Sequence, residues 1–436
     1  MVHEDEPSGL ISGLPIWDGE RCLGPATIRW HGDVIDEVSA TENSRDAGVS
    51  GTRRHSSMTD PGRLATSSSA SAAGLSIIPG LVDTHLHLEY PSDPTVKDTF
   101  PWGLYTPPEE MSLHVLANAQ ECARFGVTTM RDMASHAVEM AVSRSLESGV
   151  IRGPRVLADG EVGMTAGHGD LFTPPHAIQR NPTADSPDEC RKLVRIWARA
   201  GTTGIKIYLS GGVLSLGDKV GWRNQTRAEI RATIDEAHAL GMQVAAHCHT
   251  EQSVQIALDE GVDSIEHATA MTEAQMHAIA ERRIPVGPTL LINDVIAYRS
   301  PNASEAARSK ARQIVAGRNE TFRKAAEIGV RFVLGTDASR IWVAYGDQME
   351  EVRFMAEVFG WSAQRALVAA TRDAADSMRL DGKVGRLAPG AGVDFIVMNG
   401  RPWEHIEDLD VDNIVAVVSR GRVIRGSLEG IGARRG

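Results

Sequence analysis

Residues 243–267 read QVAAHCHTEQSVQIALDEGVDSIEH, and this stretch contains the repeating unit of the fold. Its first part, 243–247, is an apolar run that predicts a buried β-strand. A helix is predicted over 253–260 and ends at Gly261, because glycine readily adopts the left-handed conformation that closes a helix. Residues 264–267 form the next predicted strand. This strand–helix–strand order predicts parallel strands joined by a crossover helix.

The same alternation runs through most of the chain. Strands are predicted at 76–83, 127–131, 155–158, 204–209, 243–247, 264–267, 284–290 and 331–337. Thr226 and Glu229 form a capping box at the start of one intervening helix, and 302–328 is a helical insertion. Eight such strands predict an α/β fold, a (β/α)8 TIM barrel. A doubly wound sheet is the alternative, but it would leave the polar residues at the strand ends without a shared centre.

Both ends of the chain predict short strands outside the barrel. Residues 26–30 and 34–38 flank a His-Gly-Asp turn, a pattern typical of a β-hairpin. Later strands are predicted at 384–390, 394–398, 414–418 and 422–424. The predicted domains are therefore the first part of a small β-sandwich (1–80, with a flexible Ser-rich loop at 41–73), the barrel (81–380), the second part of the sandwich (381–428) and a tail (429–436).

The composition argues against several classes of function. The chain has 436 residues, with 45 Lys and Arg against 57 Asp and Glu, a formal net charge of −12. This acidic balance argues against a nucleic-acid partner, which requires a basic face. No apolar run approaches the roughly 18 residues that span a bilayer, and residues 1–7 lack the apolar segment of a secretory signal. The four cysteines are scattered without a CxxC pair, so the expected location is the reducing cytoplasm.

Side chains that can bind a metal lie at the ends of the predicted strands. His85 and His87 are two residues apart, so they share one face of a strand. Lys206 lies between two isoleucines, where a bare ammonium is costly to bury. Three further strands end in a coordinating group: His247, His267 and Asp337. In a (β/α)8 barrel these ends meet at the mouth where active sites form, so the six side chains predict a metal site.

Each of these residues also has an ordinary interpretation. The histidine pair alone can be two hydrogen-bonded core residues, and Lys206 alone can reach solvent at the barrel rim. Six coordinating groups on one barrel face are improbable by chance, which favours the metal site. The ordinary interpretation is kept for His238, on an outer helix, and for His249, which continues the inward face of its strand. Strand alternation predicts that Glu266 faces outward.

At these positions the chain resembles the amidohydrolase superfamily. The residues that carry the resemblance are Asp83-Thr84-His85-Leu86-His87, Gly204-Ile205-Lys206-Ile207, Ala246-His247, Ile265-Glu266-His267 and Gly335-Thr336-Asp337. The resemblance covers nearly all of the chain, including the Gly-Arg-Leu-Ala-Pro-Gly segment at 385–390. More closely, the chain is similar to the branch of Xaa-Pro dipeptidases and imidazolonepropionase-like enzymes, which includes ochratoxinase-type amidases. That closer similarity rests on Gly167-His168-Gly169, 210–215, 235–238 and Pro288-Thr289-Leu290.

The resemblance implies a centre of two divalent metal ions, with zinc expected first and manganese or cobalt as alternatives. The implied ligands are His85, His87 and Asp337 for the more buried metal, and His247 and His267 for the second. Lys206, carboxylated by CO2, would bridge the two metals, with a hydroxide between them. Asp337 would take the proton of the hydroxide and pass it to the leaving nitrogen. His168 would donate to the substrate carbonyl or oxyanion, or is a loop histidine bonded to backbone.

Substrate contacts are predicted for His168, Tyr208, Tyr345, Arg340 and Trp102. Tyr208 lies two residues after Lys206 and so faces inward. Tyr345-Gly346 stands where this branch commonly has His-Gly, a departure that disfavours a plain dipeptidase. Trp102 belongs to an aromatic loop, 89–111, that predicts a mouth for an apolar acyl or aryl group, although rim packing explains these aromatics as well. Arg340 and Arg299 are candidates for a carboxylate contact, and surface ion pairs explain them equally.

We therefore expect a metal-dependent amidohydrolase that cleaves the C–N bond of a small molecule, such as an N-acyl amino acid or a dipeptide. The expected partners are the small-molecule amide and further copies of the chain, without nucleic acid or membrane. A single-metal enzyme that opens a cyclic amide, like imidazolonepropionase, or deaminates a ring is the alternative. A barrel that binds without catalysis predicts the loss of one or more ligands, and none is missing.

Overall fold

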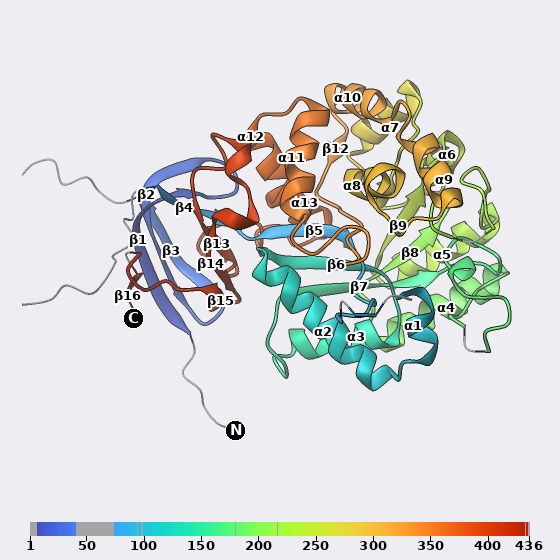
Figure 1. The fold of residues 1–436 in the computed structure, drawn as a ribbon, viewed down its shortest axis with the longest axis horizontal. Helices are drawn as coiled ribbons and strands as arrows, with labels where there is room; N and C mark the ends of the chain where they lie inside the picture. Colours follow the sequence, from blue (N-terminus) through green and yellow to red (C-terminus); the bar gives the residue numbers. More distant parts are fainter. Residues whose placement is uncertain are drawn as a thin grey trace, which may run out of the picture.

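Two eight-stranded sheets organise the protein. The computed structural model describes residues 7–40, 74–93, 95–96, 99–178, 180–215, 217–431 and 433–434. The predicted loop at 41–73 and part of the predicted tail lie outside these residues. Figure 1 shows one sheet surrounded by helices and the other, built from both chain ends, at one side of the molecule. Within the described ranges, no helix is long and apolar enough to cross a membrane.

The first sheet is parallel and curled, and its strands follow one another in chain order. They are β5 (Leu81–Leu86), β6 (Val127–Ser135), β7 (Arg155–Val162), β8 (Gly204–Tyr208), β9 (Gln243–Cys248), β10 (Ser264–His267), β11 (Pro285–Gly287) and β12 (Arg331–Phe332). The segment after β12 is hydrogen-bonded to β5: the amide of Thr84 donates to Leu334 O (2.9 Å) and that of His87 to Ala338 O (2.8 Å). The two edges of the curled sheet are therefore linked.

Helices alternate with these strands, as the sequence predicts for an α/β fold. They are α1 (Thr99–Tyr105), α2 (Pro108–Arg124), α3 (Ala137–Glu147), α4 (Pro187–Ala200), α5 (Arg227–Ala239), α6 (Glu251–Glu260), α7 (Glu273–Arg282), α8 (Leu290–Asp294), α9 (Glu305–Val315), α10 (Arg318–Ile328), α11 (Gln348–Phe359), α12 (Ala363–Ala370) and α13 (Arg372–Ser377). The capping box of Thr226 and Glu229 opens α5, and the predicted insertion consists of α9 and α10. A continuous apolar core lies between these helices and the sheet.

The second sheet combines both ends of the chain. Its order is β15 (Arg422–Gly426), β14 (Ile414–Ser419), β13 (Phe395–Asn399), β4 (Leu75–Pro79), β1 (Ser8–Trp17), β2 (Cys22–His31) and β3 (Val34–Ala40), and β16 (Ala433–Arg434) pairs with β1. The sequence predicts a β-sandwich here, and this arrangement stays a prediction. In the structure the strands are linked along one hydrogen-bonded path through β1, which has bulges after Ser12 and Pro15 and pairs with three different strands.

Gly80 marks the junction between the two sheets. The sequence predicts one strand over 76–83, but β4 ends at Pro79 and β5 begins at Leu81. A Cβ atom on Gly80 would lie 2.1 Å from Oγ1 of Thr128, so only glycine fits where the chain passes β6. The strand that leaves the second sheet thus leads directly into the strand that carries His85.

Candidate metal centre

The structure brings the six predicted ligands together around one cavity of about 390 Å³. All of them line it from the carboxyl ends of the parallel strands or the segments that follow: His85, His87, Lys206, His247, His267 and Asp337. Most are buried, and the side chains of His87 and Asp337 retain 18% and 22% exposure. The cluster therefore combines access from the cavity with burial, which strengthens electrostatic interactions.

His85, His87 and Asp337 form the first group. Their potential ligand atoms lie within 4.8 Å of one another. Oδ1 of Asp337 is 3.0 Å from Nε2 of His87 and 3.7 Å from Nε2 of His85. Burial alone raises the pKa of Asp337, but the hydrogen bond from His87 and the nearby imidazoles outweigh it and lower the pKa to about 2. The carboxylate is thus ionised, as a metal ligand must be.

His247, His267 and His249 form the second group, with ligand atoms also within 4.8 Å of one another. The sequence assigns His249 no special role, although strand alternation already places it on the inward face. Burial lowers the pKa of all three imidazoles, that of His249 to about 3. Neutral imidazoles present a lone pair, so His249 is a third nitrogen donor beside the two predicted ones.

Lys206 interacts electrostatically with residues of both groups, including His85 and His247, and its Nζ has no hydrogen-bond partner among the described residues. The side chain is 2% exposed, and burial lowers the pKa of its ammonium. A buried amine without a partner is costly, because it loses its hydration and gains no hydrogen bond in return. The chain therefore keeps an unsatisfied nitrogen in the cavity that both groups of ligands line.

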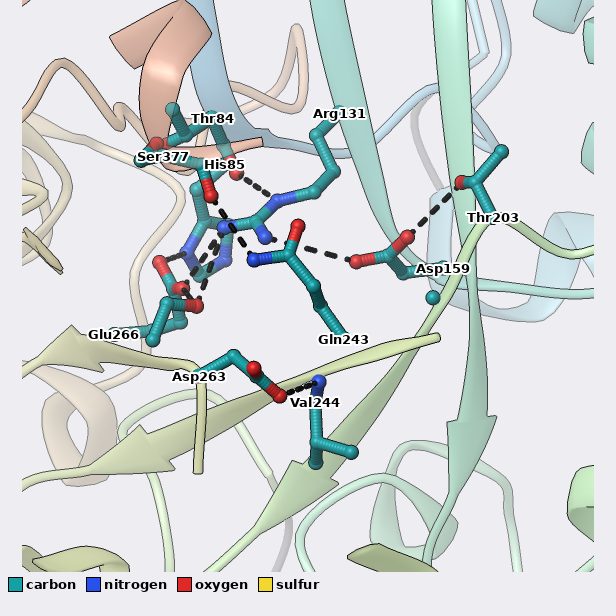
Figure 2. Close-up of polar contacts among 12 residues, drawn as sticks. Thr84, His85, Arg131, Asp159, Thr203, Gln243, Val244, Asp263, Glu266 and Ser377 are labelled. Atoms are coloured by element: carbon teal, nitrogen blue, oxygen red, sulfur yellow. Dashed lines mark hydrogen bonds and ion pairs between the residues drawn. The ribbon is translucent and has the colours of Figure 1, made fainter. Parts of the chain in front are cut away.

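Glu266 corrects one prediction, because it is fully buried and points into the barrel rather than outward. Its Oε2 accepts from Nδ1 of His85 at 2.9 Å, and Oε1 accepts from the Arg131 guanidinium at 3.1 Å (Figure 2). The physical reason is the next residue: His267 has a φ of +68° and leaves the regular strand, so simple alternation fails at this end.

The contact with Glu266 also determines which ring nitrogen of His85 carries the proton. A carboxylate only accepts hydrogen bonds, and although burial raises the pKa of Glu266, His85 and Arg131 lower it to about 2. Nδ1 of His85 therefore carries the proton, which leaves the Nε2 lone pair facing the cluster. Arg131 continues this network to Thr84 O (2.7 Å) and Asp159 (3.8 Å), as Figure 2 shows.

Three predicted substrate contacts line the same cavity: His168, Tyr208 and Trp102. The ring of His168 stacks on His247 with centroids 4.4 Å apart. The hydroxyl of Tyr208 donates to Oε1 of Glu161 at 2.8 Å, and Glu161 also lines the cavity. The acidic wall, formed by Glu89, Glu139 and Glu161, carries no motif that sequence reasoning singled out.

The structure gives other partners to the remaining candidates. Tyr345 is buried outside the cavity lining and donates its hydroxyl to the carbonyl of His87 at 2.7 Å. Arg340 pairs with Glu121, and Arg299 pairs with Glu350 at 2.7 Å. His238, given an ordinary interpretation, pairs with Asp263 at the surface. Tyr345 and Arg340 are therefore placed to support the fold around the site rather than to line it.

Known proteins share this architecture. A curated relative, ochratoxinase of Aspergillus niger, is 27% identical over 366 residues, covering 79% of this chain and 74% of the relative. The imidazolonepropionase of Streptomyces griseus is 21% identical over 369 residues, covering 78% and 82%. A solved Xaa-Pro dipeptidase with bound methionine in the active site has a TM-score of 0.79 and 27% identity, covering 96% of this chain and 99% of that one.

The family comparison covers most of the chain. The model of the amidohydrolase family matches residues 76–424, a span that includes every predicted metal ligand. It begins within β4 and ends within β15, so it takes in the whole parallel sheet and part of the second sheet. The chain belongs to the amidohydrolase family.

Proposed function

We propose that the protein is a metal-dependent hydrolase that cleaves the amide C–N bond of a small molecule, with a dipeptide or an N-acyl amino acid as the leading substrate class. The observation that carries the proposal is that two groups of ligands line one cavity together with Lys206, whose buried Nζ has no partner among the described residues. The similarity to an ochratoxinase and an Xaa-Pro dipeptidase supports this class of reaction.

The residues present suit two divalent cations. Neutral imidazoles and an ionised carboxylate are the donors that zinc, manganese and cobalt accept in proteins. His85, His87 and Asp337 would hold one ion, and His247 and His267 the other. When bound, the ions supply Lewis acidity toward water and toward a carbonyl oxygen.

Lys206 would join the two groups. Because burial lowers the pKa of its ammonium, the neutral amine that reacts with CO2 is favoured. The reaction forms an N–C bond, releases one proton and gives a carbamate with two oxygens. One oxygen can then face each group, and two bound cations would offset the negative charge of the carbamate.

Asp337 is the proposed general base and acid. Its carboxylate is ionised and half-buried at the cavity wall, so it can accept a proton from the attacking water. It then donates this proton to the amide nitrogen as that nitrogen leaves. Trp102 and Tyr208 would pack against the substrate, and the cavity of about 390 Å³ suits a small molecule.

A test combines metal analysis with a substrate screen. Purified protein is stripped, reloaded with zinc, manganese or cobalt, and incubated with X-Pro dipeptides, N-acyl amino acids, aryl amides and lactams. The proposal expects about two metal ions per chain and release of an amine from at least one acyclic amide. Full activity in protein that holds no stoichiometric metal would overturn it.

A hydrolase with one metal, acting on a cyclic amide, is the second candidate. His249 favours it, because three imidazoles already form one group without Lys206. The two candidates differ at Lys206: a mass increase of a carboxyl group and two bound metals support the first, whereas one metal and lactam opening by a Lys206→Met variant support the second.

A further inference from the structure

His168 is held in one position over the second group of ligands. Its ring stacks on His247 at 4.4 Å, and the rings of Phe172 and Tyr208 lie edge-on at 5.2 Å each. Gly212 supports the ring edge so closely that a Cβ atom there would lie 1.9 Å from Cε1 of His168. This packing fixes the plane of the ring but leaves open which nitrogen carries the proton.

A buried hydrogen-bond chain leads away from His168. Nδ1 lies 2.8 Å from Oγ of Ser215, and the Ser215 side chain is in turn hydrogen-bonded to Asp218. Asp218 is 3% exposed, and its Oδ2 also lies 3.7 Å from Nδ1. Neither Ser215 nor Asp218 lines the cavity, so these two residues act behind the ring rather than on a bound molecule.

Lys310, in the helical insertion, is the last residue of this hydrogen-bond chain. Its Nζ donates to Oδ1 of Asp218 at 2.7 Å and to the carbonyls of Gly212 and Ser215 at 3.1 and 3.0 Å. The amide of Gly212 donates to Oδ2 of Asp218 at 3.0 Å. Although burial raises the pKa of Asp218, the nearby His168 ring and the bonds from Lys310, Ser215 and Gly212 lower it below its ordinary range. Asp218 is therefore an acceptor only.

The ionised state of Asp218 sets the direction of donation along the hydrogen-bond chain. Because ionised Asp218 cannot donate, the hydroxyl of Ser215 must donate to it. The oxygen of Ser215 is then free to accept, so Nδ1 of His168 must be the donor. In the described part of the chain, Nδ1 is the ring nitrogen with a hydrogen-bond partner, which leaves Nε2 for a molecule in the cavity.

We propose that Asp218, held by Lys310, is a positioning residue that fixes the proton of His168 on Nδ1 through Ser215 and so reserves Nε2 for the substrate. The kinetic consequence of the inference rests on the proposed function, because the tautomer of His168 affects turnover only if His168 contacts an amide substrate during the reaction. Its structural consequence, the tautomer of His168, is independent of any substrate.

The decisive variant is Asp218→Asn. The amide nitrogen of asparagine can donate to Ser215, which then donates to Nδ1, so the chain reverses and the proton moves to Nε2. In serine proteases the corresponding change of aspartate to asparagine preserves the geometry, imposes the wrong histidine tautomer and costs about 10⁴ in kcat. We expect a fall in kcat of about tenfold to hundredfold here, because His168 is a donor to the substrate rather than the main base.

The tautomer is read from the ring-nitrogen NMR signals of histidine-labelled, zinc-loaded protein, with His168→Gln to assign them. Wild-type protein should show the Nδ1–H form and Asp218→Asn the Nε2–H form. Ser215→Ala, which changes little volume, should give a mixture of both. An Nδ1–H signal that persists in Asp218→Asn would overturn the inference.

Kinetics separate positioning from simple anchoring of the loop. Asp218→Asn should lower kcat with KM changed less than about threefold, whereas a displaced loop would raise KM as well. Lys310→Met should lower kcat by about tenfold, and the matched control Lys324→Met, which breaks an exposed 2.7 Å pair with Glu273, should leave kcat unchanged. If wild-type protein hydrolyses no amide, the proposed function fails, while the tautomer still decides the inference.

Discussion

The inside of the parallel sheet has two regions of opposite character. At the carboxyl ends of the strands, the ligand cluster leaves Nζ of Lys206 and Nδ1 of His87 buried without partners among the described residues. Beside it, the Arg131 network, formed by Arg131, Asp159 and Glu266, pairs its charges with one another and with Thr84 O (Figure 2). Only β10 contributes to both regions, with Glu266 in the network and His267 in the cluster, while Arg131 and Asp159 lie on β6 and β7.

The difference shows where buried polar groups without hydrogen bonds lower the stability of the fold. Buried polar groups are normally hydrogen-bonded, and those that are not require an explanation such as an ion or a catalytic role. The Arg131 network meets the rule and the ligand cluster violates it. The network therefore stabilises and orients, whereas the cluster is arranged for something that enters from the cavity.

The largest expected effect comes from removing the proton carrier in the ligand cluster. Asp337→Asn should lower kcat at least about a thousandfold, because general acid–base catalysis and one metal contact are lost together. The fold should persist, since the side chain lies at the cavity wall. Steady-state rates and thermal unfolding measured on the same preparation check this, and unchanged turnover would remove Asp337 as the base.

Breaking the Arg131 network should affect stability instead. Arg131→Met leaves Glu266 and Asp159 buried without their cation, and removing one partner of a buried pair typically costs about 3 kcal/mol or more. Urea unfolding of metal-free protein measures the loss. The control is Arg299→Met, whose exposed pair with Glu350 should contribute less than about 1 kcal/mol. Equal losses in the two variants would contradict the distinction between the regions.

Sequence patterns predict the ligand cluster better than the Arg131 network. Strand ends such as His247 and the period-two pair His85 and His87 are visible because local periodicity and barrel geometry place them at one mouth. The strand–helix order predicts the parallel sheet for the same reason. The β-sandwich stays a prediction, because the bulges in β1 that link its strands into one path leave no mark in the local sequence pattern.

The Arg131 network depends on contacts between residues far apart in the chain, which no local pattern encodes. Glu266 was predicted to face outward because alternation was applied up to His267, whose positive φ breaks it. Arg131 lies in an apolar strand and meets Glu266 only through the closed curvature of the sheet. His249 was correctly placed on an inward face but not recognised as a member of a ligand group.

Glu266→Gln tests whether the Arg131 network supports metal binding by the ligand cluster. Glutamine can still accept from Arg131, but its amide no longer favours a proton on Nδ1 of His85. Zinc affinity should fall about tenfold to hundredfold, the usual effect of losing the carboxylate behind a metal-binding histidine. Competition with a chelator measures it without reference to turnover. Unaltered affinity would show that His85 does not need this partner.

Lys206→Met gives the smallest effect and the opposite sign to Arg131→Met. In metal-free, CO2-depleted protein it removes a buried amine that has no partner, so stability should rise by about 1 kcal/mol. Burial lowers the pKa of Lys206 from 10.5, so between that lowered pKa and 10.5 the unfolded chain binds a proton that the folded chain releases. Wild-type stability therefore increases with pH across this window. The advantage of the variant should be greatest in acid and shrink as the pH approaches 10.5, and a variant less stable at every pH would place Lys206 among the residues that hold the fold.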